Sequence, residues 1–254
     1  MSILFASLLY PFQMYADFSG YSEMAIGVSL MLGFKVAENF KRPFFSSNIS
    51  EYWRRWHMSL TSWLTDYVFM PLNIKLRDWQ ITGTIVAIML NMLFVGLWHG
   101  ANWTYFFFGL YHGLLFIPLL LNGQFFKKTK VKVNSLGLPT FSIAVKMLGT
   151  YLLVTFGQFL FHASSMTDAV DILCHTITHL EGPLFIDSST LLNAAICSIA
   201  LIYVDFQEEW FPNRLLYLPK FAESWRWPLT VTMEILAILL FGIFDSNQFI
   251  YFQF

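Results

Sequence analysis

Charged residues are scarce in this 254-residue sequence. Lys, Arg, Asp and Glu make up 12% of it, roughly half the share that is usual in soluble domains. Residues 79–126 contain none of them. Hydrophobic residues make up 56% of the chain and aromatic residues 19%. A surface with so few charges suits lipid better than water, so the sequence predicts an integral membrane protein.

Other absences exclude further classes of protein. A net charge of −1 provides no basic surface for nucleic acid. Cys174 and Cys197 are too few for a disulfide framework. No Gly-Xaa-Ser-Xaa-Gly motif and no phosphate-binding loop is present, so a serine nucleophile of the hydrolase kind is not expected. No small-residue cleavage site follows the first apolar stretch, and a removable signal peptide is not expected.

Long apolar stretches predict the membrane-spanning helices. A helix needs about 20 mostly apolar residues to cross a bilayer. Residues 2–34 are predicted to form one broken or re-entrant helical region, because "DFSGYSE" interrupts their apolar pattern. The clearer spans are residues 81–98, 103–121, 147–161, 191–204 and 228–244. The expected fold class is an all-α polytopic membrane protein, with residues 1–254 as a single membrane domain.

The basic residues predict the orientation in the membrane. Residues 127–133, "KKTKVKV", form a polybasic loop that the positive-inside rule places in the cytoplasm. Residues 162–189 contain Asp168, Asp171, Glu181 and Asp187 but no Lys or Arg, which favours an extracytoplasmic connection. We therefore expect a multi-pass protein of the bacterial inner membrane.

Residues 50–72 have the pattern of an amphipathic helix at the membrane interface. At 100° per residue one side collects Trp53, Trp56, Leu60, Trp63, Leu64, Tyr67 and Val68, and the other collects Arg54, Arg55, Ser59, Ser62, Thr65 and Asp66. Ser50 is a plausible N-cap. His57 lies within the apolar arc, so its side chain is expected to point into the bundle.

His57 and His99 are the histidines whose surroundings most strongly favour chemistry. Imidazole titrates near neutrality and can serve as a general base, and polar residues inside a bilayer tend to mark function. A packing role is the alternative for both. Gly96 and Gly100 flank the bend at His99, where they favour either a kinked helix end or a tight hairpin. Asn102 either orients the imidazole or caps the next helix.

The remaining histidines point less clearly to chemistry. His112 lies in the middle of a predicted span and is expected to be a hydrogen-bonded core residue. His175 and His179 have an i, i+4 spacing that can bind metal, but no carboxylate completes a recognisable motif, so no metal site is expected.

Four sequence blocks occur in order along the chain: "YADFSGYSEMAIGVSLMLGF", "ENFKRPFFSSNISEYWRRWHMSLTSWLTDYVFMPL", "GLWHGANWTYFFFGLYHG" and the terminal "FIYFQF". Together they resemble the membrane-bound O-acyltransferase (MBOAT) superfamily, most closely its bacterial branch of alginate and peptidoglycan O-acetyltransferases. The D-alanyl transferase of teichoic acid modification is a more distant relative. The resemblance is to the C-terminal half of such proteins, and "NIKLRDW" replaces the family's glycine-rich basic segment.

The resemblance implies an MBOAT-like helical bundle with broken or re-entrant and interfacial helices. It implies an enzyme that moves an acyl group across the membrane to hydroxyls of an extracytoplasmic polysaccharide, and acetyl is the acyl group that the resemblance favours. His99 matches the catalytic histidine of the family and His57 the second functional one. The expected cavity-lining residues are Asp17, Ser19, Tyr21, Trp53, Trp56, Trp98 and Asn102.

No bound cofactor is expected. The acyl donor is an acetyl-CoA or another acyl thioester, and a periplasmic transferase is the expected partner. Three alternatives stay open: D-alanyl transfer to teichoic acid, a transporter that uses the histidines for proton relay, and a non-catalytic scaffold fragment.

Overall fold

The computed structural model describes residues 2–127, 133–134, 136–178, 188–212 and 225–241. The chain divides into two compact units, residues 1–185 and residues 186–253. A single membrane domain over residues 1–254 stays a prediction. The described residues form helices and no β-strand, apart from an isolated antiparallel bridge between Val133 and Pro139.

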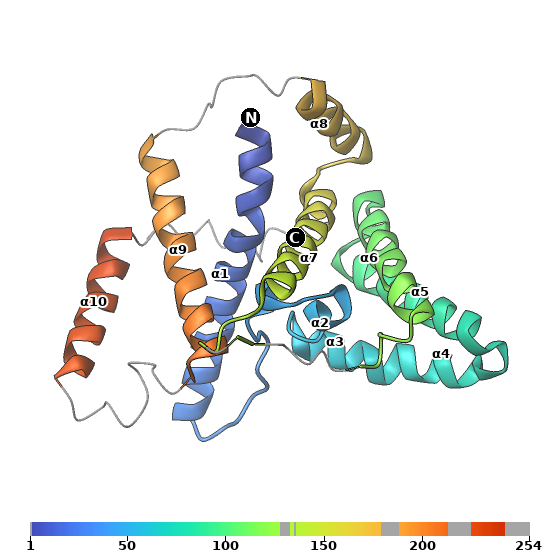
Figure 1. The fold of residues 1–254 in the computed structure, drawn as a ribbon, viewed down its shortest axis with the longest axis horizontal. Helices are drawn as coiled ribbons and strands as arrows, with labels where there is room; N and C mark the ends of the chain where they lie inside the picture. Colours follow the sequence, from blue (N-terminus) through green and yellow to red (C-terminus); the bar gives the residue numbers. More distant parts are fainter. Residues whose placement is uncertain (1, 128–132, 135, 179–187, 213–224, 242–254) are drawn as a thin grey trace. The chain divides into compact units, whose positions relative to one another are not determined.

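The first unit contains α1 to α8 (Figure 1). Its long helices are α1 (Ser2–Met31), α5 (Gln80–His99), α6 (Trp103–Leu121) and α7 (Phe141–His162). Its short ones are η1 (Pro43–Phe45), α2 (Ile49–Trp53), α3 (Met58–Leu64), the π-helical turn η2 (Thr65–Phe69), α4 (Met70–Lys75), η3 (Arg77–Trp79) and α8 (Met166–Thr178). Helix α6 packs between α5 and α7, α1 packs along α7, and the short α2 contacts both α6 and α7.

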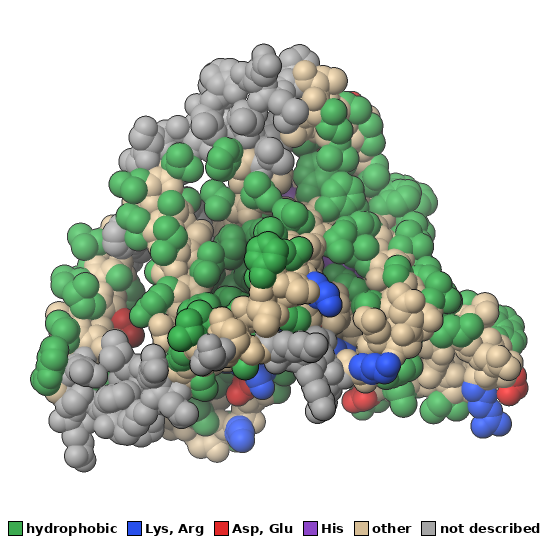
Figure 2. All heavy atoms as spheres, in the orientation of Figure 1, with side chains coloured by type: hydrophobic (Ala, Val, Ile, Leu, Met, Phe, Trp, Pro, Cys, Tyr) green, Lys and Arg blue, Asp and Glu red, His purple; other side chains and the backbone are tan. Residues whose placement is uncertain are grey.

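Four helices in the described part of the chain are long and apolar enough to cross a membrane: Arg77–His99, Trp103–Leu121, Phe141–His162 and Leu191–Trp210. They confirm four of the predicted spans and, with the helical composition, the all-α polytopic membrane class. The apolar helix Trp227–Leu240 is shorter, so the span over residues 228–244 stays a prediction. On the visible face of the first unit, hydrophobic side chains cover much of α5 and α6, while most charged side chains lie toward the lower end of the view, near α3, α4 and the end of α1 (Figure 2).

Helix α1 contradicts the predicted break. It runs without interruption from Ser2 to Met31, through "DFSGYSE" and through Pro11. The polar stretch stays helical because its side chains find partners: the Ser22 hydroxyl donates to the Phe18 carbonyl at 2.9 Å and accepts from Asn39 Nδ2 at 3.3 Å. The polar residues of "DFSGYSE" therefore form a face of α1 that packs against residues 39–59, and they do not interrupt the helix.

The single helix predicted over residues 50–72 is also wrong. The segment forms α2, then a turn at residues 54–57, then α3 and the helical continuation through η2 and α4. The N-cap of α2 is Asn48, whose side chain accepts from Glu51 N–H at 2.9 Å, and not Ser50. The turn is possible because His57 adopts a left-handed backbone, with φ 44° and ψ 53°. An interfacial location of the segment stays a prediction.

Glycines bring α5 and α6 into close contact. A Cβ atom on Gly96 would lie 2.1 Å from the Tyr105 carbonyl oxygen, and one on Gly109 would lie 2.4 Å from the Met92 carbonyl oxygen. Only residues without a Cβ allow the two backbones to approach so closely. Gly96 thus serves the packing of the hairpin, whereas Gly100, with φ 150°, ends α5.

The second unit contains α9 (Ser188–Trp210) and α10 (Arg226–Phe241). Most of the described side chains of α10, and many of those of α9, are exposed and apolar. Such an all-round apolar exterior is typical of helices that face lipid or other protein.

Candidate active site

His57 lies at the turn between α2 and α3, held by backbone hydrogen bonds on both sides. Met58 N–H donates to the Asn39 carbonyl at 2.8 Å, and the His57 carbonyl accepts from Thr61 N–H at 2.9 Å. The imidazole is buried and contacts Phe18 and Trp98, with ring centroids 4.8 and 5.9 Å away. The side chain therefore points into the protein, as the sequence predicted.

Asn39 organises this turn and was not predicted. Its Oδ1 accepts from the backbone N–H of Ser59 at 3.3 Å and from the Ser59 hydroxyl at 2.9 Å, while its Nδ2 reaches Ser22 on α1. One amide thereby joins α1 to the start of α3. The only signal in the sequence was its place in the same family block as His57.

His99 is the last residue of α5, directly before Gly100. Its ring is held by aromatic contacts: the centroids of Trp98, Tyr105 and Phe161 lie at 4.8, 6.1 and 4.7 Å. Phe161 comes from α7 and Tyr105 from α6, so three helices fix the position of the imidazole. Trp98 contacts both His57 and His99 and links the two rings.

The electrostatics of His57 favour the neutral imidazole. His57 lies outside the four candidate spans. Burial lowers its pKa from 6.5 to about 4, and His99 contributes a smaller effect in the same direction. Its Nδ1 is buried and has no hydrogen-bond partner among the described residues. A buried ring nitrogen without a partner is costly for stability, and a neutral one can accept a proton at physiological pH.

Of the residues predicted to line a cavity, Trp56 and Trp98 make aromatic contacts, whereas those on α1 differ in exposure. Trp98 lies against both histidines, and Trp56 stacks on Tyr52 and contacts Phe40 and Tyr15. Asp17 and Ser19 are half-buried on α1, whereas Tyr21 is exposed.

Trp53 points elsewhere. Its indole N–H donates to Nδ1 of His112 at 3.3 Å, with the rings perpendicular and 5.2 Å apart. The indole therefore faces α6 rather than the neighbourhood of His57. Trp53 is therefore part of the core that supports the turn.

His112 is fully buried and hydrogen-bonded, which agrees with the expected core role. On its other side Nε2 approaches Gly157 of α7 so closely that a Cβ there would lie 2.3 Å away. Trp53, His112 and Gly157 thus lock α2, α6 and α7 together.

Asn102 caps α6 rather than orienting the His99 ring. Its Oδ1 accepts from Thr104 N–H at 3.2 Å, and its Nδ2 donates to the Ser164 carbonyl at 3.4 Å. Gly100 N–H likewise donates to the Leu97 carbonyl at 3.2 Å. Of the two alternatives drawn from the sequence, the structure supports the cap.

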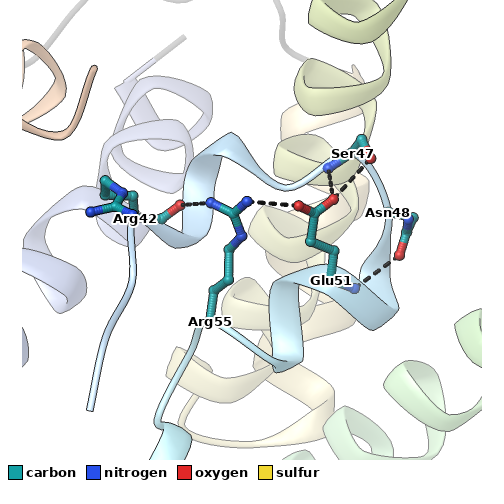
Figure 3. Close-up of polar contacts among 5 residues, drawn as sticks. All are labelled: Arg42, Ser47, Asn48, Glu51 and Arg55. Carbon is teal, nitrogen blue, oxygen red and sulfur yellow. Dashed lines mark hydrogen bonds and ion pairs between the residues drawn. The ribbon is translucent and has the colours of Figure 1, made fainter. Parts of the chain in front are cut away.

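A buried ion pair fixes α2 from the other side (Figure 3). The Glu51 carboxylate accepts from the backbone and hydroxyl of Ser47 at 3.0 and 2.9 Å and pairs with Arg55 at 2.7 Å. Arg55 also donates to the Arg42 carbonyl at 3.5 Å. The sequence pattern placed Arg55 on the polar side of one amphipathic helix and did not predict this network. It secures the chain on both sides of the His57 turn.

Several predictions concern residues outside those that the structure describes, among them Glu181, Asp187 and the terminal block "FIYFQF". The polybasic loop falls mainly on residues 128–132, and His179 of the i, i+4 pair lies in residues 179–187. Within the described ranges, no three His, Cys, Asp or Glu side chains lie close enough together to hold a metal ion.

Comparison with known proteins identifies the family. The sequence profile of the MBOAT, membrane-bound O-acyltransferase family, matches residues 1–143, more than half of the chain. This chain is 39% identical over 184 residues to the "Probable alginate O-acetylase AlgI" of Pseudomonas putida, covering 70% of this chain and 33% of that protein. It is 43% identical over 110 residues to the "Peptidoglycan O-acetyltransferase" of Helicobacter pylori, covering 42% of this chain and 20% of that protein.

A third relative, the "Teichoic acid D-alanyltransferase" of Streptococcus thermophilus, is 41% identical over 127 residues, covering 48% of this chain and 30% of that protein. The chain thus spans a third or less of the length of these three relatives. The profile match includes both histidines and all of α1 to α6. The chain belongs to the membrane-bound O-acyltransferase family.

Proposed function

We propose that this chain is the catalytic part of a membrane O-acyltransferase. It transfers an acyl group, with acetyl as the favoured one, to hydroxyls of an extracytoplasmic polysaccharide. The observation that carries the proposal is the convergence of two histidines. His57 from the α2–α3 turn and His99 from the end of α5 both contact Trp98. Relatives named for alginate and peptidoglycan O-acetylation support the reaction class.

His99 acts as the general base in this proposal. Its imidazole accepts the proton of the attacking hydroxyl while the hydroxyl oxygen bonds to the carbonyl carbon of an acyl thioester. The carbon–sulfur bond then breaks, the thiolate leaves with the electron pair and takes the proton back from His99. The products are an ester and a thiol, and the base is regenerated.

His57 relays a proton or positions the donor. Its buried Nδ1 has no hydrogen bond to a described residue and is available to a substrate. The oxyanion of the tetrahedral intermediate needs donors. The second N–H of the Asn102 amide is one candidate, because Oδ1 and the other N–H already have partners.

The donor is an acetyl-CoA or another acyl thioester that arrives from the cytoplasm. The acyl group then reaches the polysaccharide through a separate periplasmic transferase, and the protein resides in the bacterial inner membrane. The aromatic surroundings of His99 suit the acyl chain of a thioester.

Acetyl transfer from radiolabelled acetyl-CoA tests the proposal. Membranes that contain the chain, alone and together with the helices that precede this region in longer relatives, are compared with the His99→Ala, His57→Ala and His175→Ala variants. We expect His99→Ala to abolish transfer at equal expression and folding. His175→Ala is the control, because that histidine is exposed on α8. Near-normal transfer by a folded His99→Ala variant would remove His99 from its role.

D-alanyl transfer to teichoic acid is the second candidate. It is favoured by the relatives named for that reaction, at 41% identity in Streptococcus thermophilus and 35% in Bacillus subtilis. It requires an acyl carrier protein on the cytoplasmic face, so copurification with a small carrier would support it. Proton or solute flux in proteoliposomes without any acyl product would favour a transporter. If His99→Ala changes neither acyl transfer nor flux, a non-catalytic scaffold is favoured.

A further inference from the structure

Two buried hydroxyl groups near the end of α7 have no hydrogen-bond partner among the described residues. They belong to Tyr10 on α1 and to Thr104, which is fully buried at the start of α6. A buried tyrosine usually finds a partner for its O–H group, and a buried polar group without a partner lowers stability. A native protein that retains such groups calls for an explanation, and hydrogen bonding to a bound substrate is one.

The hydroxyls of three comparable residues in the same bundle are bonded. Tyr111 O–H donates to the Leu153 carbonyl at 2.9 Å, and Tyr151 O–H donates to the Leu8 carbonyl. Thr155 on α7 donates to the carbonyl four residues earlier at 2.9 Å, as a threonine inside a helix can do. Thr104 lies in the first turn of α6 and has no helical carbonyl four residues before it, so its O–H stays available.

Tyr10 approaches His99 from α1. Its ring packs on His162, the last residue of α7, with centroids 4.5 Å apart. The residue before it, Phe161, lies 4.7 Å from the His99 ring and 5.0 Å from the Tyr105 ring. Tyr10 also interacts electrostatically with Tyr105, whose ring borders His99 at 6.1 Å. Tyr10 is therefore one layer of side chains away from the proposed base.

Thr104 approaches the same place from α6. It directly precedes Tyr105 and lies one helical turn before Phe108, so Thr104 and Phe108 share a face of α6. Phe108 packs on Phe161 with centroids 5.3 Å apart, and this face is therefore directed toward α7. The two unpartnered hydroxyls thus lie on both sides of the end of α7 that contacts His99.

The proposed reaction needs hydrogen-bond donors close to His99. Attack on the thioester moves the carbonyl electron pair onto oxygen, and donors that are already oriented stabilise this charge without reorganisation. Phenol and aliphatic hydroxyl groups keep their protons at neutral pH, and each can donate one hydrogen bond. The surrounding aromatic rings of Phe108 and Phe161 exclude water, and such an apolar environment strengthens a hydrogen bond to a charged oxygen.

We propose that the Tyr10 and Thr104 hydroxyls donate hydrogen bonds to the oxyanion of the tetrahedral intermediate. The inference rests on the proposed acyltransferase function and adds two catalytic residues to it, beside the N–H of Asn102. The oxyanion forms as the attacking oxygen bonds to the carbonyl carbon and His99 takes its proton. The carbonyl is restored when the carbon–sulfur bond breaks and the thiolate leaves with the electron pair. Tyr10 and Thr104 keep their own protons throughout.

Removal of each hydroxyl with little change in shape tests the proposal. Tyr10→Phe and Thr104→Val are compared with Tyr111→Phe and Thr155→Val, which remove bonded hydroxyls. Initial rates at varied concentrations of radiolabelled acetyl-CoA, in membranes in which the full wild-type chain shows transfer, separate kcat from KM. We expect Tyr10→Phe and Thr104→Val each to lower kcat about 100-fold, the effect of losing one oxyanion donor. KM for acetyl-CoA should change little, because these bonds form fully only in the transition state.

Thermal unfolding in one detergent separates catalysis from structure. Loss of an unpartnered hydroxyl should leave Tm unchanged or raise it, because no hydrogen bond is lost on replacement. Tyr111→Phe and Thr155→Val should lower Tm by about 2–4 °C through the loss of one hydrogen bond. These two control variants should retain the wild-type kcat at a temperature where all the proteins are folded.

Three results would overturn the proposal. They are an unchanged kcat in Tyr10→Phe or Thr104→Val, a Tm loss there that equals the loss in the controls, and a rise in KM without a change in kcat. His99→Ala separates this inference from the proposed function. Transfer that depends on His99 but not on the two hydroxyls would refute the inference alone, whereas a wild type without transfer would refute both.

Discussion

Replacement of Gly96 by alanine tests the idea that close approach of α5 and α6 positions His99. The new Cβ would lie 2.1 Å from the carbonyl oxygen of Tyr105 and 3.3 Å from the backbone nitrogen of Gly109. Non-bonded carbon atoms normally stay about 3.5 Å from their neighbours. Since the obstructing atoms are backbone, no rotamer change relieves the clash, and the two helices must separate by about 1 Å.

The magnitude follows from two opposing effects. Overpacking a rigid contact costs about 1–3 kcal/mol, and a clash with backbone belongs at the upper end. Alanine in place of glycine in a helix interior gains about 1 kcal/mol. The expected net loss is about 2 kcal/mol, or roughly 4–8 °C in Tm for a domain of this size. Gly149 in α7 is the matched control, because a Cβ there meets nothing within 4 Å, and Gly149→Ala should gain about 1 kcal/mol.

Thermal unfolding in one detergent, followed by circular dichroism, compares the two variants. Acetyl transfer is measured in parallel at a temperature where both are folded. We expect Gly96→Ala to lower both Tm and transfer, because α5 ends at His99, whereas Gly149→Ala should leave transfer unchanged. A Tm for Gly96→Ala that equals or exceeds the wild-type value would refute the reasoning about helix approach.

Three further outcomes are expected. Asn102→Ala should lower the free energy of unfolding by about 1 kcal/mol through loss of the α6 N-cap. Asn102→Asp should retain most of this stabilisation, because its carboxylate can also cap the helix. Equal losses in thermal unfolding for the two variants would contradict the capping role. Glu51→Ala should cost about 3–5 kcal/mol because Arg55 loses its buried partner, whereas Asp78→Ala at the exposed Arg77 pair should stay within about 0.5 kcal/mol in the same assay. The folded-state pKa of His57 is lowered from 6.5 to about 4, so the unfolded chain binds more protons than the folded one between pH 4 and 6.5. The contribution of His57 to the free energy of unfolding should therefore fall as the pH drops from 6.5 to 4, and it should not change above pH 6.5. Melting curves across this range should show a smaller slope in His57→Gln, and an unchanged slope would assign the pH dependence to other groups.

The sequence alone determined the membrane class and most of the spanning helices. Residues 103–121 were predicted as a span with the same bounds as α6, and the other confirmed spans overlap the observed helices. This succeeds because hydrocarbon thickness sets a minimum length of apolar helix, and apolar length is a local property that can be read along the chain. The family blocks likewise identified His57 and His99 as the residues to examine.

Only the tertiary structure decided how these residues are held. The polar stretch in α1 stays helical because Asn39, distant in sequence, bonds to Ser22. The helix predicted over residues 50–72 is broken at His57 because the Glu51–Arg55 network and the Asn39 contacts stabilise a left-handed backbone there. Helical periodicity describes one segment at a time and contains no information on partners from other segments. The contact of His57 with Trp98, beside His99, arises from packing between segments far apart in the chain.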